Sequence, residues 1–194
     1  MDKIKKILAK DPKLKKWMKL ERTFPKGTKN ITMKLVSSIL SQQLSTTVAR
    51  VMHERFLNLI GKKSPKAEDI LKFSVDEIRA IGISRQKAGY IHNVAEFMVE
   101  HKITLAKLNK MSDEEIIELL IQIKGVGRWT VEMLLIFGMG REDVFAVDDL
   151  GIQKAMIETF KLHDLPKKEL RLKMMDISKR WSPYRTYVCL HFWG

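Results

Sequence analysis

The sequence has a single cysteine, Cys189, and this scarcity excludes two kinds of site. An intrachain disulfide needs two cysteines, and a cysteine-ligated iron–sulfur cluster needs several thiolates. The apolar neighbours Val188 and Leu190 predict a buried, inert thiol. The five histidines show no spacing with cysteines or carboxylates that would predict a zinc site.

Long apolar runs are missing too, since no stretch approaches the roughly 18 residues of a transmembrane helix. The lysine-rich start is not followed by the apolar core of a signal peptide. We therefore expect no membrane partner and a location in the cytosol, a nucleoid or a nucleus. Alternating strand patterns are also lacking, and helical periodicity dominates, which predicts an all-α fold.

Acidic residues are outnumbered: 36 Lys and Arg stand against 23 Asp and Glu, which gives a net charge of +13. Such an excess favours a polyanionic partner, because neutralising phosphates releases condensed counterions. Lysine-rich surfaces also serve solubility, so charge alone leaves this partner open. With 194 residues, 45% of them hydrophobic, the chain can bury a sizeable core.

Two segments of the chain resemble each other. The segments 74–78 and 112–116 each match a capping box, with Ser at the N-cap and Glu three residues later. Each short helix is followed by a turn that contains glycine: the segment 81–85 has one glycine and the segment 124–128 has two. A longer helix then follows, over 86–99 in the first copy and over 129–137 in the second. This pattern predicts two helix–hairpin–helix motifs.

The pattern of residues 1–22 predicts one or two basic amphipathic helices with a solvated lysine face.

The second hairpin is suited to binding a phosphate. Gly125 and Gly127 permit positive φ and close approach of the backbone to a DNA strand. We expect the N–H groups of 125–128, including that of Val126, to face one phosphate, with help from the helix dipole and from Lys124 or Arg128. The alternative is a simple interhelical turn, in which glycine is routine.

Several motifs in order resemble one protein family. The run 123–130 and the later Asp149-Leu150-Gly151-Ile152 are similar to the signature of helix–hairpin–helix DNA glycosylases. Trp129 together with 144–151 resembles the 3-methyladenine DNA glycosylase II branch. Further matches are 35–45, 81–89 and 181–193, so the resemblance runs from about residue 31 to the C-terminus.

The resemblance implies a fold and a division of the chain. It implies one glycosylase domain over 1–194 with two helical lobes and the pocket between them. The central lobe spans 31–140 with its hairpin at 123–128, and 1–30 joins 141–194 in the second lobe. Larger relatives carry an N-terminal β domain, which we do not expect in a chain of 194 residues.

In the family, the aspartate that matches Asp149 is catalytic. Breaking a base–sugar bond leaves positive charge on the deoxyribose, and a nearby carboxylate stabilises that charge and orients or deprotonates the attacking water. An alkylated purine already carries positive charge, so it leaves without a strong general acid. The alternative for both aspartates is capping of the next helix. We expect Asp148 to cap and Asp149 to act in catalysis.

Trp129 indicates the class of mechanism, because bifunctional relatives have at this position a lysine that forms a Schiff base. Indole cannot do so, and water is then the nucleophile. The expected activity is removal of alkylated purines such as 3-methyladenine and 7-methylguanine from double-stranded DNA by a monomer, with hypoxanthine as a further candidate. Two alternatives remain open: a bifunctional lyase acting on oxidised bases, and a non-catalytic DNA-binding module.

The indoles of Trp129 and Trp193 are candidates for a base pocket, since electron-rich faces attract a cationic base. Core packing is the alternative for both. Met133 stands where a family member has tyrosine, which implies softer stacking.

A flipped base leaves a gap in the duplex that a protein side chain must fill. The resemblance places Gln43 at the inserting position, with Gln42 and Leu44 as neighbours; the alternative is a polar helix cap. Arg85 and Lys87 are candidates for contacts with the DNA backbone, or else solvated charges. No cofactor is expected, apart from a sodium or potassium ion that family hairpins often bind, here through the carbonyls of Ile121, Ile123 and Val126.

Overall fold

The computed structural model describes residues 2–19 and 21–193, and throughout these it contains helices and turns but no strand. The all-α prediction is therefore confirmed. None of the helices in this part of the chain is long and apolar enough to cross a membrane. The chain divides into two compact units, one formed by 1–26 with 140–194 and the other by 27–139. The boundaries expected from the sequence were 31 and 140.

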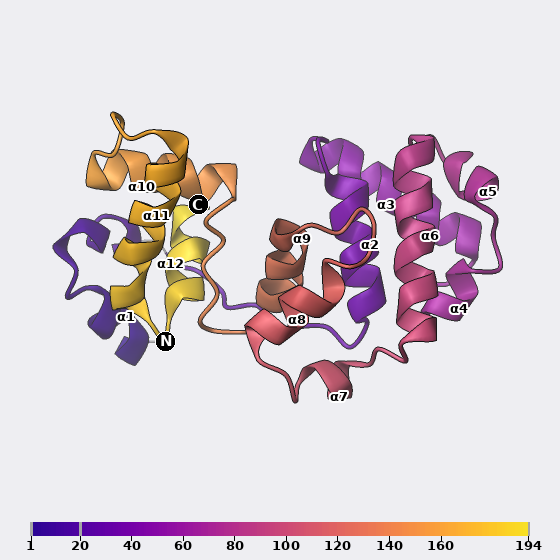
Figure 1. Cartoon of the computed structure of the whole chain (residues 1–194), viewed down its shortest axis with the longest axis horizontal. Helices are drawn as coiled ribbons and strands as arrows, with labels where there is room; N and C mark the ends of the chain where they lie inside the picture. Colours follow the sequence, from indigo (N-terminus) through magenta and orange to yellow (C-terminus); the bar gives the residue numbers. More distant parts are fainter. Residues whose placement is uncertain (1, 20, 194) are drawn as a thin grey trace. The chain divides into compact units, whose positions relative to one another are not determined.

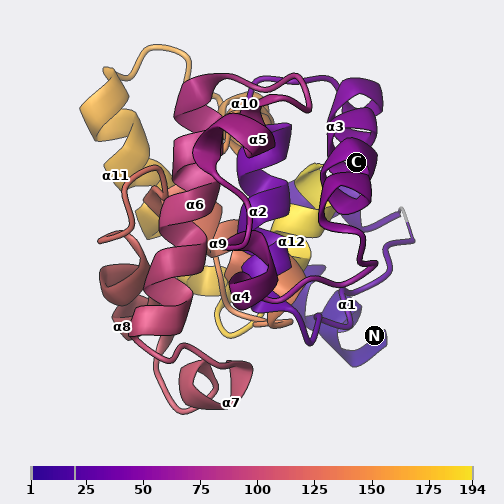
Figure 2. The same cartoon turned by 90° about the vertical axis from the view of Figure 1, so that its right-hand side faces the viewer.

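The second unit is built around α2 (Ile31–Ser41), whose buried positions occur on nearly every side of the helix. This helix packs against α3 (Thr46–Ile60), α6 (Arg85–Glu100), α9 (Arg128–Met133) and the π-helical turn η3 (Leu134–Gly138). Figures 1 and 2 both show α6 running alongside α2. The short helices α4 (Ala67–Ile70), α5 (Val75–Arg79), α7 (Leu105–Leu108) and α8 (Asp113–Leu120) complete the unit.

The two predicted helix–hairpin–helix motifs are present as α5–α6 and α8–α9. Both capping boxes form: Ser74 pairs with Glu77 at the start of α5, and Ser112 pairs with Glu115 at the start of α8. The glycines that turn the chain have nearly the same conformation, with φ of 102° at Gly82 and 101° at Gly125. The copy with one glycine thus keeps the same left-handed turn.

The first unit contains α10 (Leu150–Phe160), α11 (Lys167–Ser178) and α12 (Arg185–Phe192), together with α1 (Asp2–Leu8) (Figure 1). The same unit contains the 3₁₀ turns η1 (Pro12–Leu14) and η2 (Trp17–Lys19), which follow α1, and η4 (Lys179–Trp181), which lies between α11 and α12. Its core includes Leu14, Met156 and the buried thiol of Cys189. The predicted burial of this thiol is confirmed.

The N-terminal segment differs from the amphipathic helices that we predicted for residues 1–22. It forms one short helix and two 3₁₀ turns, because Pro12 interrupts the helical pattern. The segment is also fixed by side chains: the Trp17 indole donates to Thr159 at 3.0 Å, and Asp11 accepts from the Trp181 indole at 3.0 Å. It therefore contributes apolar side chains to the core of the first unit as well as lysines to its surface.

Candidate functional site

Asp149 lies where the buried segment 144–147 ends and α10 begins. Its Oδ1 accepts from the backbone N–H groups of Gly151 at 2.8 Å and Ile152 at 3.0 Å, so Asp149 is the N-cap of α10. The Trp193 indole N–H donates to the same oxygen at 2.8 Å. Three donors thus fix the orientation of the carboxylate, which is half-buried.

The cap assignment made from the sequence was wrong. We expected Asp148 to cap the helix, but its carboxylate is exposed and forms a two-pronged ion pair with Arg171, at 2.9 and 3.2 Å. Asp149 caps instead, because its extended backbone (φ −75°, ψ 128°) turns the side chain back toward the first N–H groups of α10. Capping and catalysis are compatible, since a carboxylate has several acceptor positions.

Trp193, a candidate from the sequence for the base pocket, holds Asp149 through its indole N–H. Its ring is half-buried and its N–H is directed at Asp149. Gly151 makes this approach possible: a Cβ there would lie 3.1 Å from Asp149 Oδ1 and 3.2 Å from Trp193 Cδ1. No sequence pattern indicated this hydrogen bond, because the two partners are 44 residues apart.

The remaining predicted site residues belong to the second unit. Trp129 and Met133 follow each other by one turn on α9, but Met133 is buried at 7% exposure whereas Trp129 is half-buried. The Gln42 side chain, at the end of α2, is directed at Thr130 of α9, with 3.5 Å between Gln42 Nε2 and Thr130 Oγ1. The structure thus brings Gln42 and α9 together within this unit.

The hairpin between α8 and α9 departs from the prediction in two ways. Only Gly125 has positive φ, and a Cβ there would overlap the Tyr90 ring; Gly127 has φ −97° and open space around it. Moreover, the Val126 N–H donates to the Ile123 carbonyl at 2.9 Å, so it stabilises the turn and is not directed outward. Asn93 supports the hairpin from α6 through a bond from its amide to the Lys124 carbonyl at 3.1 Å.

The two cations beside the hairpin differ. Lys124 is exposed. The Arg128 guanidinium, in contrast, holds Glu114 at 2.8 and 3.0 Å and Glu132 at 3.1 Å. The hydrogen bonds that Arg128 donates to Glu114 keep the pKa of Arg128 well above its ordinary value, and they lower the pKa of Glu114 in turn. Arg128 therefore ties α9 to α8.

The turn Gln42-Gln43-Leu44 joins α2 to α3, and Ser45 caps α3. Gln43 is exposed with φ 59°, and Leu44 is exposed at 37%. Arg85 is exposed at the start of α6, with its guanidinium 4.0 Å from Asp76. Lys87 donates to two carbonyls of the turn region, a role that no pattern in the sequence predicted.

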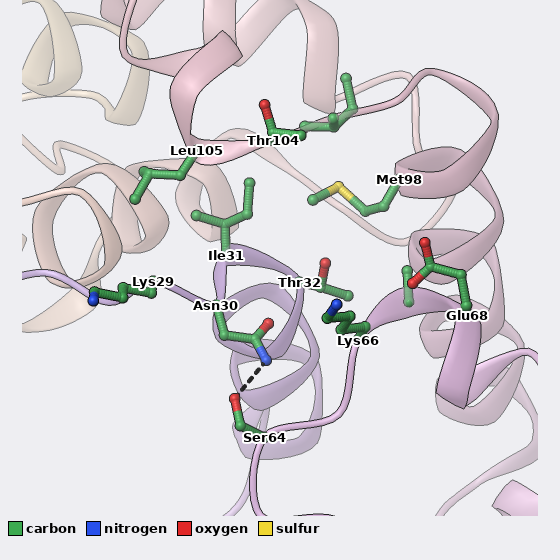
Figure 3. A pocket seen from close by; sticks show the side chains of 12 residues that line it. Lys29, Asn30, Ile31, Thr32, Ser64, Lys66, Glu68, Met98, Thr104 and Leu105 are labelled. Atoms are coloured by element: carbon green, nitrogen blue, oxygen red, sulfur yellow. Dashed lines mark hydrogen bonds between the residues drawn. The ribbon is translucent and has the colours of Figure 1, made fainter.

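A cavity of about 360 Å³ in the second unit contains none of the predicted site residues (Figure 3). Figure 3 shows the hydrogen bond at its wall from Asn30 to Ser64, 2.9 Å long, and Asn30 also caps α2 through the Met33 N–H. These polar groups stabilise the fold. Among residues 2–19 and 21–193, no three His, Cys, Asp or Glu side chains gather as a metal would require.

Comparison with known proteins gives consistent matches. The model of the HhH-GPD superfamily of base excision DNA repair proteins matches residues 36–180. The chain is 35% identical over 165 residues to YfjP of Bacillus subtilis, covering 82% of this chain and 56% of YfjP. It is 36% identical over 161 residues to DNA-3-methyladenine glycosylase 1 of Schizosaccharomyces pombe, covering 82% of this chain and 69% of the relative.

A solved structure agrees with these sequence matches. The S. pombe 3-methyladenine DNA glycosylase Mag1, solved in complex with abasic DNA, superimposes with a TM-score of 0.85 and 31% identity. The match covers 98% of this chain and 95% of that one. This chain thus spans little more than half of YfjP and nearly all of the solved Mag1 chain.

Proposed function

The chain belongs to the HhH-GPD superfamily of base excision DNA repair proteins, and we propose that it is a monofunctional DNA glycosylase for alkylated purines. Its reaction is hydrolysis of the N-glycosidic bond of bases such as 3-methyladenine and 7-methylguanine in duplex DNA. Relatives named 3-methyladenine glycosylases, at 31–36% identity, support this substrate class. The partner is double-stranded DNA, and the enzyme acts as a monomer in a nucleoid or nucleus.

The observation that carries the proposal is the fixed carboxylate of Asp149. Loss of the base leaves positive charge on C1′ and the ring oxygen of the deoxyribose, and a preorganised anion lowers the energy of that state. The three donors on Oδ1 hold this anion in one orientation, so little reorganisation is needed during the reaction. The same carboxylate orients or deprotonates the attacking water.

Trp129 supports a hydrolytic mechanism. An indole forms no Schiff base, so the abasic product remains in an intact strand. Borohydride should therefore trap no covalent protein–DNA adduct, and a trapped adduct would favour the bifunctional lyase instead. In the proposed reaction Trp129 stacks on the cationic base. Met133 contributes at most the edge of its buried thioether.

The second unit supplies the contacts with DNA. The outward surface at Gly127, with Lys124 beside it, suits a backbone phosphate, and Gln43 with Leu44 suits insertion into the gap that a flipped base leaves. Arg85 adds an exposed cation. The proposal includes a sodium or potassium ion bound by the carbonyls of Ile121, Ile123 and Val126, and the Ile123 oxygen, which accepts one hydrogen bond, has a second lone pair for it.

The test compares variants of two neighbouring carboxylates, Asp148 and Asp149. Methylated genomic DNA is incubated with the protein, and released bases are identified by mass spectrometry. We expect free methylpurines from the native protein and from Asp148→Asn, because an exposed ion pair contributes little. Asp149→Asn should release none while still binding abasic DNA. Equal release by Asp149→Asn and the native protein would refute the proposed mechanism.

A further inference from the structure

The turn between α2 and α3 is held by a lysine from another helix. Lys87 lies in the first turn of α6 and donates from Nζ to the Leu40 carbonyl at 3.1 Å and the Gln42 carbonyl at 2.7 Å. These carbonyls belong to the last turn and the C-cap of α2, where helix carbonyls have no intrahelical partner. A cation there also interacts favourably with the helix dipole.

The turn needs such support because its central residue is strained. Gln43 has φ 59°, a left-handed conformation that is unfavourable for a residue with a Cβ. Strain of this kind persists only where the surrounding contacts impose it. The Leu44 N–H bond to the Ser41 carbonyl, at 3.2 Å, closes the turn locally, and Lys87 is the contact that reaches it from α6.

The space beside the turn places these groups together. A cavity of about 300 Å³ is lined by Gln43, Leu44 and Lys87, with Met52 of α3 and Ile83 of the first hairpin. Lys87 lines this cavity, and its ammonium ends on the turn backbone. Partial burial lowers the pKa of Lys87 from its ordinary value, which agrees with an ammonium withdrawn from solvent.

We propose that Lys87 is a positioning residue that holds the Gln43–Leu44 turn ready to enter the DNA duplex when a base is flipped. This inference rests on the proposed function, because it assigns Lys87 to the base-flipping step of that reaction. Lys87 then acts through the turn and not through a phosphate: its ammonium is engaged with protein carbonyls, whereas Arg85 two residues earlier is exposed.

The experiment separates flipping from the rest of the reaction. Single-turnover release of 7-methylguanine is measured from two duplexes, one with cytosine opposite the lesion and one with an abasic site opposite it. The second duplex lacks the paired base, so flipping costs less and depends less on a filled gap. Lys87→Met keeps the apolar stem and removes the donors.

We expect Lys87→Met to slow release from the paired duplex about tenfold, because unpairing the base is the step that the turn supports, and to change release from the other duplex less than about twofold. Lys87→Arg keeps a cationic donor and should recover part of the lost rate. Lys110→Met removes an exposed lysine of the same unit and should leave both rates unchanged.

An equal loss on both duplexes would overturn the proposal, since a structural defect or a lost phosphate contact affects both alike. No loss on either duplex would overturn it as well. If Lys87→Met does not fold, Lys87→Gln, which keeps an amide donor with shorter reach, is judged by the same ratio of rates. Failure of the proposed function is distinct: the native protein would then release no base from either duplex.

Discussion

At the scale of single residues, the site depends on hydrogen bonds that fix a carboxylate. Asp149 was identified as catalytic from a resemblance, whereas its three donors became visible only in the structure. The sequence could not reveal the donor Trp193, because a contact across 44 residues depends on how α10 and α12 pack. Gly151 allows this contact, but the sequence analysis identified it only as one residue of a family motif.

Replacement of Trp193 tests the role of its N–H. Trp193→Phe retains an aromatic ring but removes the donor to Asp149, and a hydrogen bond to a charged group is worth about 1.5–3 kcal/mol. We expect single-turnover base release to slow by about tenfold or more while affinity for abasic DNA changes little. Weaker substrate binding at an unchanged rate would instead show that the ring serves as a pocket wall.

At the scale of elements, the two hairpin glycines have different tasks. Gly125 has positive φ and lies against the Tyr90 ring, whereas a side chain at Gly127 would meet open space. The motif predicted both glycines alike, because a sequence pattern does not tell which glycine turns the chain and which leaves room for a ligand. The packing of α6 beneath the hairpin decides between them.

Alanine at each position should separate folding from DNA binding. Gly125→Ala should lower the thermal unfolding midpoint by several degrees, because it adds strain and a clash with Tyr90. Gly127→Ala should leave the midpoint nearly unchanged and weaken binding to duplex DNA. The two variants are compared by thermal denaturation and by DNA titration. Equal DNA binding by Gly127→Ala and the native protein would contradict a phosphate at this surface.

The start of α4 gives the second unit a pH-dependent contribution to stability. Asp69 accepts from the Lys62 ammonium at 2.6 Å and from the Lys66 N–H at 3.0 Å, and these bonds lower its pKa from 3.8 to about 2. Because the pKa of Asp69 is lower in the folded than in the unfolded chain, its ionised carboxylate stabilises the folded state at pH values above the unfolded pKa. This contribution is lost as the pH falls from about 4 to about 2.

Asp69→Asn therefore has an expected pH profile. The variant should be less stable than the native protein at pH 7, and the difference should shrink as the pH falls below 4. Urea unfolding of both proteins at several pH values measures this difference in the free energy of unfolding. A constant difference from pH 7 to pH 2.5 would show that protonation of Asp69 is not linked to folding.

At the scale of the whole molecule, the sequence predicted the class of fold and the repeated motif better than the ends of elements. The capping boxes and hairpin glycines are local signals, and they placed α5, α6, α8 and α9 nearly correctly. The helix predicted over 129–137 is present, but it changes to a π-helical turn at Leu134. That change accompanies packing against α2, which no local pattern encodes.

The salt dependence of DNA binding identifies which of the positively charged residues contact phosphates. Each phosphate contact releases condensed counterions, so the slope of log affinity against log salt falls by about 0.9 for each contact that is lost. Net charge counts Lys124 and Arg128 alike. The structure separates them, because Arg128 is committed to Glu114 and Glu132 while Lys124 is exposed.

Lys124→Met should reduce the slope of duplex DNA binding by about 1, whereas Arg128→Met should leave the slope unchanged. Arg128→Met should instead lower the thermal midpoint, since it leaves the almost fully buried Glu132 without this ion pair. The measurement is a titration of undamaged duplex at several salt concentrations. A slope that falls equally in both variants would mean that DNA draws Arg128 away from its carboxylates, and that the ion pairs of the free protein do not show which cations are available to DNA.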